Sequence, residues 1–165
     1  MNLLDLPPIG TLRRNHALEH ATMHLLTQRH PGLRLVAHAT LSGFTLYGEV
    51  DTQEVSSAVT EAISRLQGGE HHLAVHPRCG TNIATAGLLA GLATFIVMRG
   101  KGRLRKLPRA LLASVAALVV AQPLGLGIQA RLTTLPDLEG AFIEEVTRQQ
   151  MANLIVHRVK VSGYA

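Results

Sequence analysis

The sequence has few aromatic residues and a single cysteine. Its 165 residues include no tryptophan, two tyrosines and three phenylalanines, which leaves little to stack against nucleic-acid bases. The lone cysteine, Cys79, cannot form an internal disulfide and therefore does not indicate a redox compartment. Residues 1–10 have neither a basic start nor an apolar run of useful length, so the sequence predicts no secretory signal peptide.

Acidic residues are missing from the middle of the chain. All eleven lie before His71 or after Pro136. Two uncharged, mostly apolar stretches, 79–98 and 110–130, fall within this gap. A helix needs about 20 such residues to cross a bilayer, so the two stretches predict a membrane protein with two spans. The alternative is a buried helical hairpin in a soluble core, but neither stretch has the charged face of a soluble surface helix.

The segment between the two predicted spans is strongly basic. Residues 99–109 contain six basic residues and no acidic one, and they supply most of the net charge of +5. Membrane lipids are therefore the expected polyanionic partner, and nucleic acid is not. The positive-inside rule places this loop in the cytoplasm and both chain ends outside. Because about 80 residues would then cross without a signal peptide, the sequence leaves the orientation open.

The remaining residues predict a small mixed helix and sheet domain, so the expected fold class is α+β with an inserted two-helix transmembrane hairpin. Apolar periodicity and turn signals give the elements. In chain order we expect a helix at 11–30, strands at 33–40 and 44–50, a capped helix from 51 to the glycine pair 68–69, a strand at 70–76, the two spans, a helix at 137–150 and a strand at 153–162.

The last predicted strand is too short to fold alone, so we expect it to return and complete the sheet begun by the first two. This divides the chain into three parts. They are a polar α+β domain at 1–78, a transmembrane hairpin at 79–130 with its basic loop at 99–109, and a C-terminal helix and strand at 131–165 that complete the polar domain.

Residues 16–20 spell H-x-x-E-H within the first predicted helix. On a helix, His16 and His20 lie one turn apart on the same face and can reach one metal ion, with Glu19 nearby. The motif resembles the signature of the inverzincin metallopeptidases, which implies zinc bound by the two histidines and Glu19 as catalytic base. The alternative is a helix of solvated imidazoles. His24, two turns beyond His16, is too distant from it to share an ion.

A catalytic zinc site has three protein ligands and an open position for water, so a third donor must come from elsewhere. One source is the polar run 76–82, in which Cys79 or His76 would complete the set. The simpler interpretation of this run is a loop that caps the membrane helix, with Thr81 or Asn82 as N-cap. The other source is the acidic segment after the second span, which contains Glu139, Glu144 and Glu145. The inverzincin resemblance favours the last two, and the sequence leaves the choice open.

The motifs NHALEHAT at 15–22 and HPRCGTN at 76–82 together resemble a family of small uncharacterised bacterial membrane proteins found in cyanobacteria and related phyla. The resemblance implies the membrane architecture but no activity. Taken with the H-x-x-E-H motif, the sequence predicts a zinc metallopeptidase, anchored in the cell membrane by two spans, that cleaves peptide or membrane-protein substrates near the bilayer. We also expect that the chain can form a homo-oligomer. The alternatives are a non-enzymatic metal- or haem-binding membrane protein and a structural membrane subunit.

Overall fold

The computed structural model describes residues 3–152 and 154–164. The chain divides into two compact units. The polar unit consists of Met1–His76 and Ala130–Ala165, and the hairpin unit consists of Pro77–Gln129. Helices and an antiparallel sheet are both present, so the predicted α+β class is confirmed.

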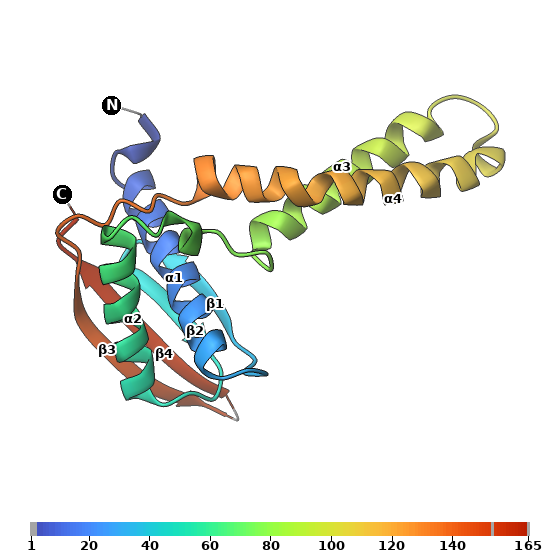
Figure 1. The fold of residues 1–165 in the computed structure, drawn as a ribbon. Coiled ribbons are helices and arrows are strands. Elements are labelled where there is room, and N and C mark those ends of the chain that lie inside the picture. Colours follow the sequence, from blue (N-terminus) through green and yellow to red (C-terminus); the bar gives the residue numbers. More distant parts are fainter. Residues whose placement is uncertain (1–2, 153, 165) are drawn as a thin grey trace. The chain divides into compact units, whose positions relative to one another are not determined.

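The polar unit is built on a four-stranded antiparallel sheet with the order β1-β2-β4-β3. Helices α1 and α2 pack side by side against this sheet (Figure 1). Their apolar residues meet those of the strands in one buried core. The elements of this unit are η1 (Leu3–Asp5), α1 (Ile9–Arg29), β1 (Val36–Thr40), β2 (Gly43–Tyr47), α2 (Thr52–Gln67), η2 (His71–Ala74), β3 (Phe142–Met151) and β4 (Leu154–Ser162).

Helix α2 shows how the local sequence fixes an element. The Asp51 side chain accepts a hydrogen bond of 2.7 Å from the Gln53 N–H and so caps the first turn. The helix ends before Gly68, and Gly69 follows with a positive φ of 91°. Its buried positions repeat every three or four residues, which is the spacing that predicted it. Both helices predicted before the spans are confirmed.

The final strand returns to the sheet as predicted. Strand β4 pairs with β2 on one side and with β3 on the other, so Leu46 and Arg148 both lie opposite His157. Asn153, the first residue of the predicted strand, lies outside the described residues. The polar unit is thus completed only by residues that follow the hairpin in sequence.

Two predicted elements of the polar unit are wrong. Residues 70–76 contain the short 3-10 helix η2 in place of a strand, and its Leu73 and Ala74 are buried in the core. The C-terminal helix expected at 137–150 is instead the edge strand β3. Pairing with β4 provides its backbone hydrogen bonds, and this tertiary contact overrides the helix propensity of its Glu, Gln, Arg and Met residues.

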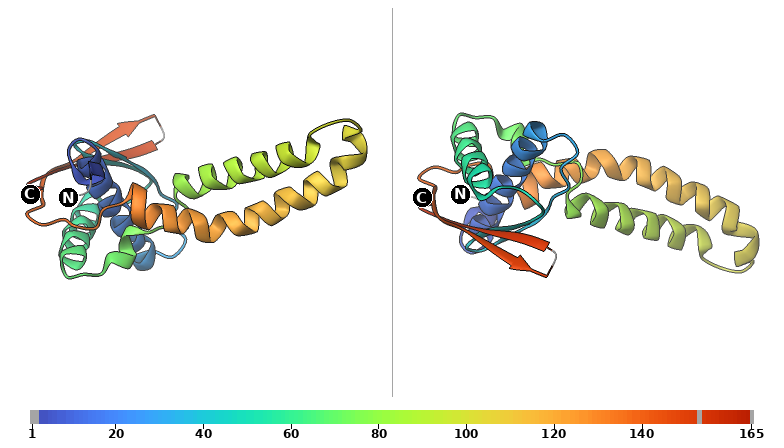
Figure 2. Two further views of the ribbon diagram at one scale, coloured as in Figure 1. Left: turned by 90° about the horizontal axis from the view of Figure 1, so that it is seen from above. Right: turned by 90° about the horizontal axis from the view of Figure 1, so that it is seen from below.

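The hairpin unit contains α3 (Gly80–Met98) and α4 (Arg103–Ile128), followed by a π-helical turn at Gln129–Thr133. Both helices are long and apolar enough to cross a membrane. They run side by side in antiparallel directions (Figure 2). The Thr94 and Ser114 hydroxyls join them by a hydrogen bond of 2.6 Å.

The glycines of the hairpin unit differ in how closely other residues approach them. A Cβ added at Gly87 or Gly91 meets no described atom within 4 Å, so this G-x-x-x-G pair does not face α4. Close approach occurs instead at Gly125, where an added Cβ would lie 2.4 Å from Asn82 Oδ1. Helix α4 continues through Pro123 to Ile128.

Candidate metal centre

The H-x-x-E-H residues lie together on the inner side of α1. One ring nitrogen of His16 and one of His20 lie within 4.8 Å of each other, and their ring centroids are 4.3 Å apart. His20 is 3% exposed and Glu19 is 6% exposed, whereas His16 is partly exposed. Two nitrogens on one tetrahedral zinc ion lie about 3.4 Å apart, so a small rotation of the rings would bring both to a single ion.

Backbone carbonyls determine which nitrogen of each imidazole carries the proton. His16 Nδ1 lies 2.9 Å from the Thr133 carbonyl oxygen, and His20 Nδ1 lies 2.8 Å from the Ala74 carbonyl oxygen. A carbonyl can only accept, so each Nδ1 donates. In the neutral rings the lone pairs are therefore on Nε2. Metal-binding histidines almost always donate their other ring N–H to a carbonyl, carboxylate or water in this manner.

Two further imidazoles extend the site. The ring of His76 lies 5.8 Å from that of His20 and 4.8 Å from that of His24, measured between centroids. His24 donates from Nε2 to the Val75 carbonyl oxygen at 2.9 Å. The structure thus brings four histidines of the polar unit into one continuous cluster. We call it the histidine cluster: His16, His20, His24 and His76.

A buried arginine fixes the carbonyl that orients His16. Arg13 Nη2 donates to the carbonyl oxygens of Arg131 and Thr134, at 2.9 and 3.1 Å. Its own carbonyl oxygen accepts the Leu135 N–H at 3.1 Å. Arg13 also forms an ion pair with Asp5. These bonds hold the segment that carries the Thr133 carbonyl against α1.

Asn15 anchors the opposite face of α1. Its Nδ2 donates to the Thr40 carbonyl oxygen on β1 at 2.8 Å, and its Oδ1 accepts from the Tyr164 hydroxyl. Burial raises the pKa of Tyr164 well above its ordinary value, so its hydroxyl remains a donor. The helix that carries the site is therefore tied to the sheet and to the C-terminal segment.

Sequence reasoning missed these supports. The carbonyls of Thr133, Ala74 and Val75 have no residue signature, because any amino acid supplies a carbonyl. Arg13 was the one detectable part, since it is a charged residue one turn before His16 on the same helix face. It could have been flagged as a buried cation in need of partners.

Cys79 begins the hairpin unit, three residues after His76. It is the N-cap of α3, and its Sγ accepts the Thr81 N–H at 3.4 Å. The cap was expected at Thr81 or Asn82, so the expectation of a capping loop holds but the capping residue is different. A helix N-terminus favours negative charge, and a thiolate at Cys79 would gain from it.

The acidic candidates lie on the sheet. Glu144 accepts a hydrogen bond from the Ser162 hydroxyl, and Glu145 Oε2 lies 3.1 Å from Lys160 Nζ. Glu139 lies in the exposed turn before β3. All three carboxylates are exposed, and the two on β3 are engaged with side chains of β4.

Fold and site together define a class: an α+β protein that carries a histidine-lined candidate metal centre and two helices long enough to span a membrane. The chain belongs to the family described as "Domain of unknown function (DUF6391)", whose family model matches residues 11–146. It is also similar to an uncharacterized protein of Picosynechococcus sp., with 38% identity over 149 residues that cover 82% of this chain and 71% of the relative. No solved structure matches the chain. The expectation of an uncharacterised family is confirmed.

Proposed function

We propose that this chain is a zinc-dependent peptidase anchored in the cell membrane by α3 and α4, with His16 and His20 as metal ligands and Glu19 as general base. The observation that supports it best is the pair of Nδ1 hydrogen bonds to the Thr133 and Ala74 carbonyls. They place the lone pairs of two neighbouring imidazoles on Nε2, as metal binding requires.

Cys79 is the third ligand in this proposal. Three residues of extended chain span at most about 11 Å, so Cys79 remains near His76 of the histidine cluster wherever the hairpin unit lies. A thiolate with two imidazoles is a known catalytic zinc set. Glu144 and Glu145 are weaker candidates because their carboxylates contact Ser162 and Lys160 on the sheet.

The chemistry follows from the positions on α1. Zinc in such a site lowers the pKa of a bound water towards neutrality and polarises a peptide carbonyl. Glu19, which is buried and directly precedes His20 on α1, would take the proton of that water and pass it to the leaving amine. Because the same chain carries two helices long and apolar enough to cross a membrane, the proposed substrates are presented at the bilayer surface, such as membrane-anchored peptides or unfolded segments of membrane proteins.

The test separates metal binding from hydrolysis. The full chain is purified in detergent, its zinc content is measured by elemental analysis, and cleavage of quenched-fluorescence peptides in the same micelles is followed. Glu19→Gln should keep the metal and lose cleavage by at least about a hundredfold, the contribution of a general base. Cleavage at the wild-type rate by Glu19→Gln would remove Glu19 from the mechanism. His71→Ala, at an exposed position in η2, is the matched control and should change neither quantity.

A second candidate function is a metal-binding protein without hydrolysis. The low exposure of Glu19 and His20 favours it, because a buried ligand set leaves little room for a substrate. So does His76, which would close the coordination sphere with a further imidazole. This candidate predicts bound metal in both the wild type and Glu19→Gln, and no cleavage in either.

A further inference from the structure

The positive charge of this protein is concentrated in the turn between α3 and α4. Six of its sixteen basic residues lie in 99–109, which leaves ten basic against eleven acidic residues in the rest of the chain. The segment therefore carries more than the whole net charge of +5. We call residues 99–109 the basic turn. Such a concentration of positive charge attracts polyanionic surfaces.

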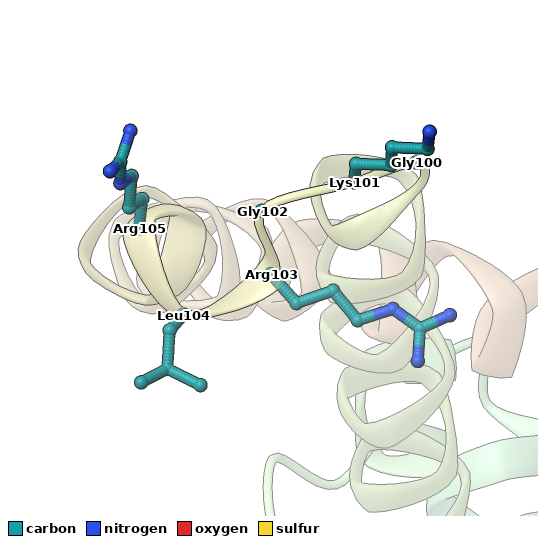
Figure 3. A pocket seen from close by; sticks show the side chains of 6 residues that line it. All are labelled: Gly100, Lys101, Gly102, Arg103, Leu104 and Arg105. Carbon is teal, nitrogen blue, oxygen red and sulfur yellow. The ribbon is translucent and has the colours of Figure 1, made fainter.

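The basic turn forms a hollow. Residues Gly100 to Arg105 line a shallow hollow that is largely open to the surroundings. Gly100 and Gly102 have positive φ values of 85° and 77°, which bend the chain around it. Figure 3 shows Lys101 and Arg105 extending on one side of the turn and Leu104 on the other.

The first turns of α4 have an apolar face and a basic face. Leu104, Leu107 and Leu111 are exposed and recur at helical spacing, so they form one apolar stripe. Arg105 and Arg109, four residues apart, lie on another face. Ala110, which is buried, belongs to neither face. A helix with an apolar stripe beside a basic face suits the boundary between acyl chains and headgroups.

We propose that the basic turn binds the phosphate groups of anionic phospholipids. The apolar stripe of Leu104, Leu107 and Leu111 would then lie among the acyl chains. The apolar helices that flank the turn on both sides set its depth at the bilayer surface, which is why a lipid and not a soluble anion is the occupant. The proposal depends on the proposed membrane location but not on the metal centre. It also assigns the turn to the leaflet richer in anionic lipid, which in most cells faces the cytoplasm.

The experiment measures lipid preference with the full chain in a bilayer. The protein is reconstituted in phosphatidylcholine vesicles that contain trace spin-labelled phosphatidylglycerol or spin-labelled phosphatidylcholine, and the association constant of each at the protein is compared. The wild type should prefer phosphatidylglycerol. The variant Lys101→Gln/Arg103→Gln/Arg105→Gln should lose that preference by about fivefold for each charge that contacts a headgroup. Arg103→Lys/Arg105→Lys should keep most of it.

The matched control removes three basic residues from the polar unit, as Arg34→Gln/Arg148→Gln/Arg158→Gln, and should leave the preference unchanged. Equal association of both lipids with the wild type, or an equal loss in the control, would overturn the proposal. Titration of inorganic phosphate into the protein in neutral detergent is the second arm. Saturable millimolar binding that the triple variant abolishes would identify a soluble-anion site and would also overturn the lipid assignment. The zinc content of the triple variant is measured as well. If it equals that of the wild type, the change in lipid preference does not come from loss of the metal centre.

Discussion

The Nδ1 of His20 donates a hydrogen bond to the carbonyl oxygen of Ala74, 2.8 Å away. Val75, the next residue, accepts from His24 in the same way. The segment that begins with η2 therefore uses backbone carbonyls to orient imidazoles of α1. The segment in which a strand was wrongly predicted is thus the one whose carbonyls orient two imidazoles of the histidine cluster.

Metal occupancy should depend on the two histidines of α1. We expect the wild type to retain about one zinc ion per chain after exchange into metal-free buffer. His16→Ala and His20→Ala should each lower the retained zinc by tenfold or more, because each removes a direct ligand. Elemental analysis of the purified full chain checks this. His71→Ala should match the wild type, and zinc retention by both α1 variants would refute the assignment.

The identity of the third ligand can be read from spectra of the cobalt-substituted protein. Cobalt occupies zinc sites and gives a thiolate-to-metal charge-transfer band only when sulfur is bound. We expect this band in the wild type and in His76→Ala, and its loss in Cys79→Ser. A band-free wild-type spectrum with full cobalt occupancy would exclude Cys79 and leave His76 as the nearest donor in the cluster.

Gly125 should be sensitive to the addition of one methyl group. A Cβ there would lie 2.4 Å from Asn82 Oδ1 and 3.2 Å from Asn82 Cα. Asn82 joins the ends of the hairpin unit, since its Oδ1 accepts from Gln129 at 2.6 Å and its Nδ2 donates to the Pro77 carbonyl at 2.8 Å. We expect Gly125→Ala to lower the free energy of unfolding by about 1–3 kcal/mol.

Gly127→Ala is the control for this prediction, because its Cβ would meet no described atom within 4 Å. It should be neutral or slightly stabilising, as alanine is the better helix former. Thermal unfolding of both variants in the same detergent is the measurement. Equal stability of the two would show that the contact at Asn82 carries no strain.

Stability should fall in mild acid because of His157. This imidazole is fully buried on β4, with its Nε2 3.2 Å from Thr52 Oγ1. Burial lowers its pKa, the Arg148 cation lowers it further, and Asp51 opposes the shift. The unfolded chain therefore takes up this proton more readily than the folded one. Its contribution to the free energy of unfolding is complete above a pH of about 6.5 and declines as the pH falls towards the lower folded pKa.

The magnitude of this effect has a limit. A single proton changes the unfolding free energy by at most about 1.4 kcal/mol per pH unit. His157→Gln should remove this part of the pH dependence while other histidines still contribute. Thermal denaturation at pH 7.5 and 5.5 gives the comparison. Identical pH dependence in wild type and variant would show that His157 does not titrate differently on folding.

Sequence patterns predicted the elements whose caps and buried faces are set by neighbouring residues in the chain. Helix α2 carries its own cap at Asp51 and a regular apolar face, and both hold in the structure. Strand β3 carries opposite signals. Its sequence FIEEVTRQQM mixes the helix formers Glu, Arg, Gln and Met with the strand formers Phe, Ile, Val and Thr, and the pairing with β4 decides in favour of a strand. That strand also places Glu144 and Glu145 on the sheet surface, so an error in local structure altered the list of candidate ligands.

The candidate site was only partly accessible to sequence reasoning. The spacing of His16, Glu19 and His20 places them on one helix face without any knowledge of the fold. The proximity of His76 to His24 depends on how η2 returns to α1, which no local pattern encodes. The carbonyls that accept hydrogen bonds from the imidazoles could not be predicted either, because their positions also depend on how the chain folds back on α1.

Strand β4 sits between β2 and β3, although the entire hairpin separates β2 from β4 along the chain. During synthesis the ribosome completes both apolar helices before it delivers the strand that β2 needs. The nascent polar unit must therefore wait with an open β2 edge until synthesis of the hairpin is complete. An unpaired strand edge can pair with another chain, so this edge is open to misassembly until β4 is made.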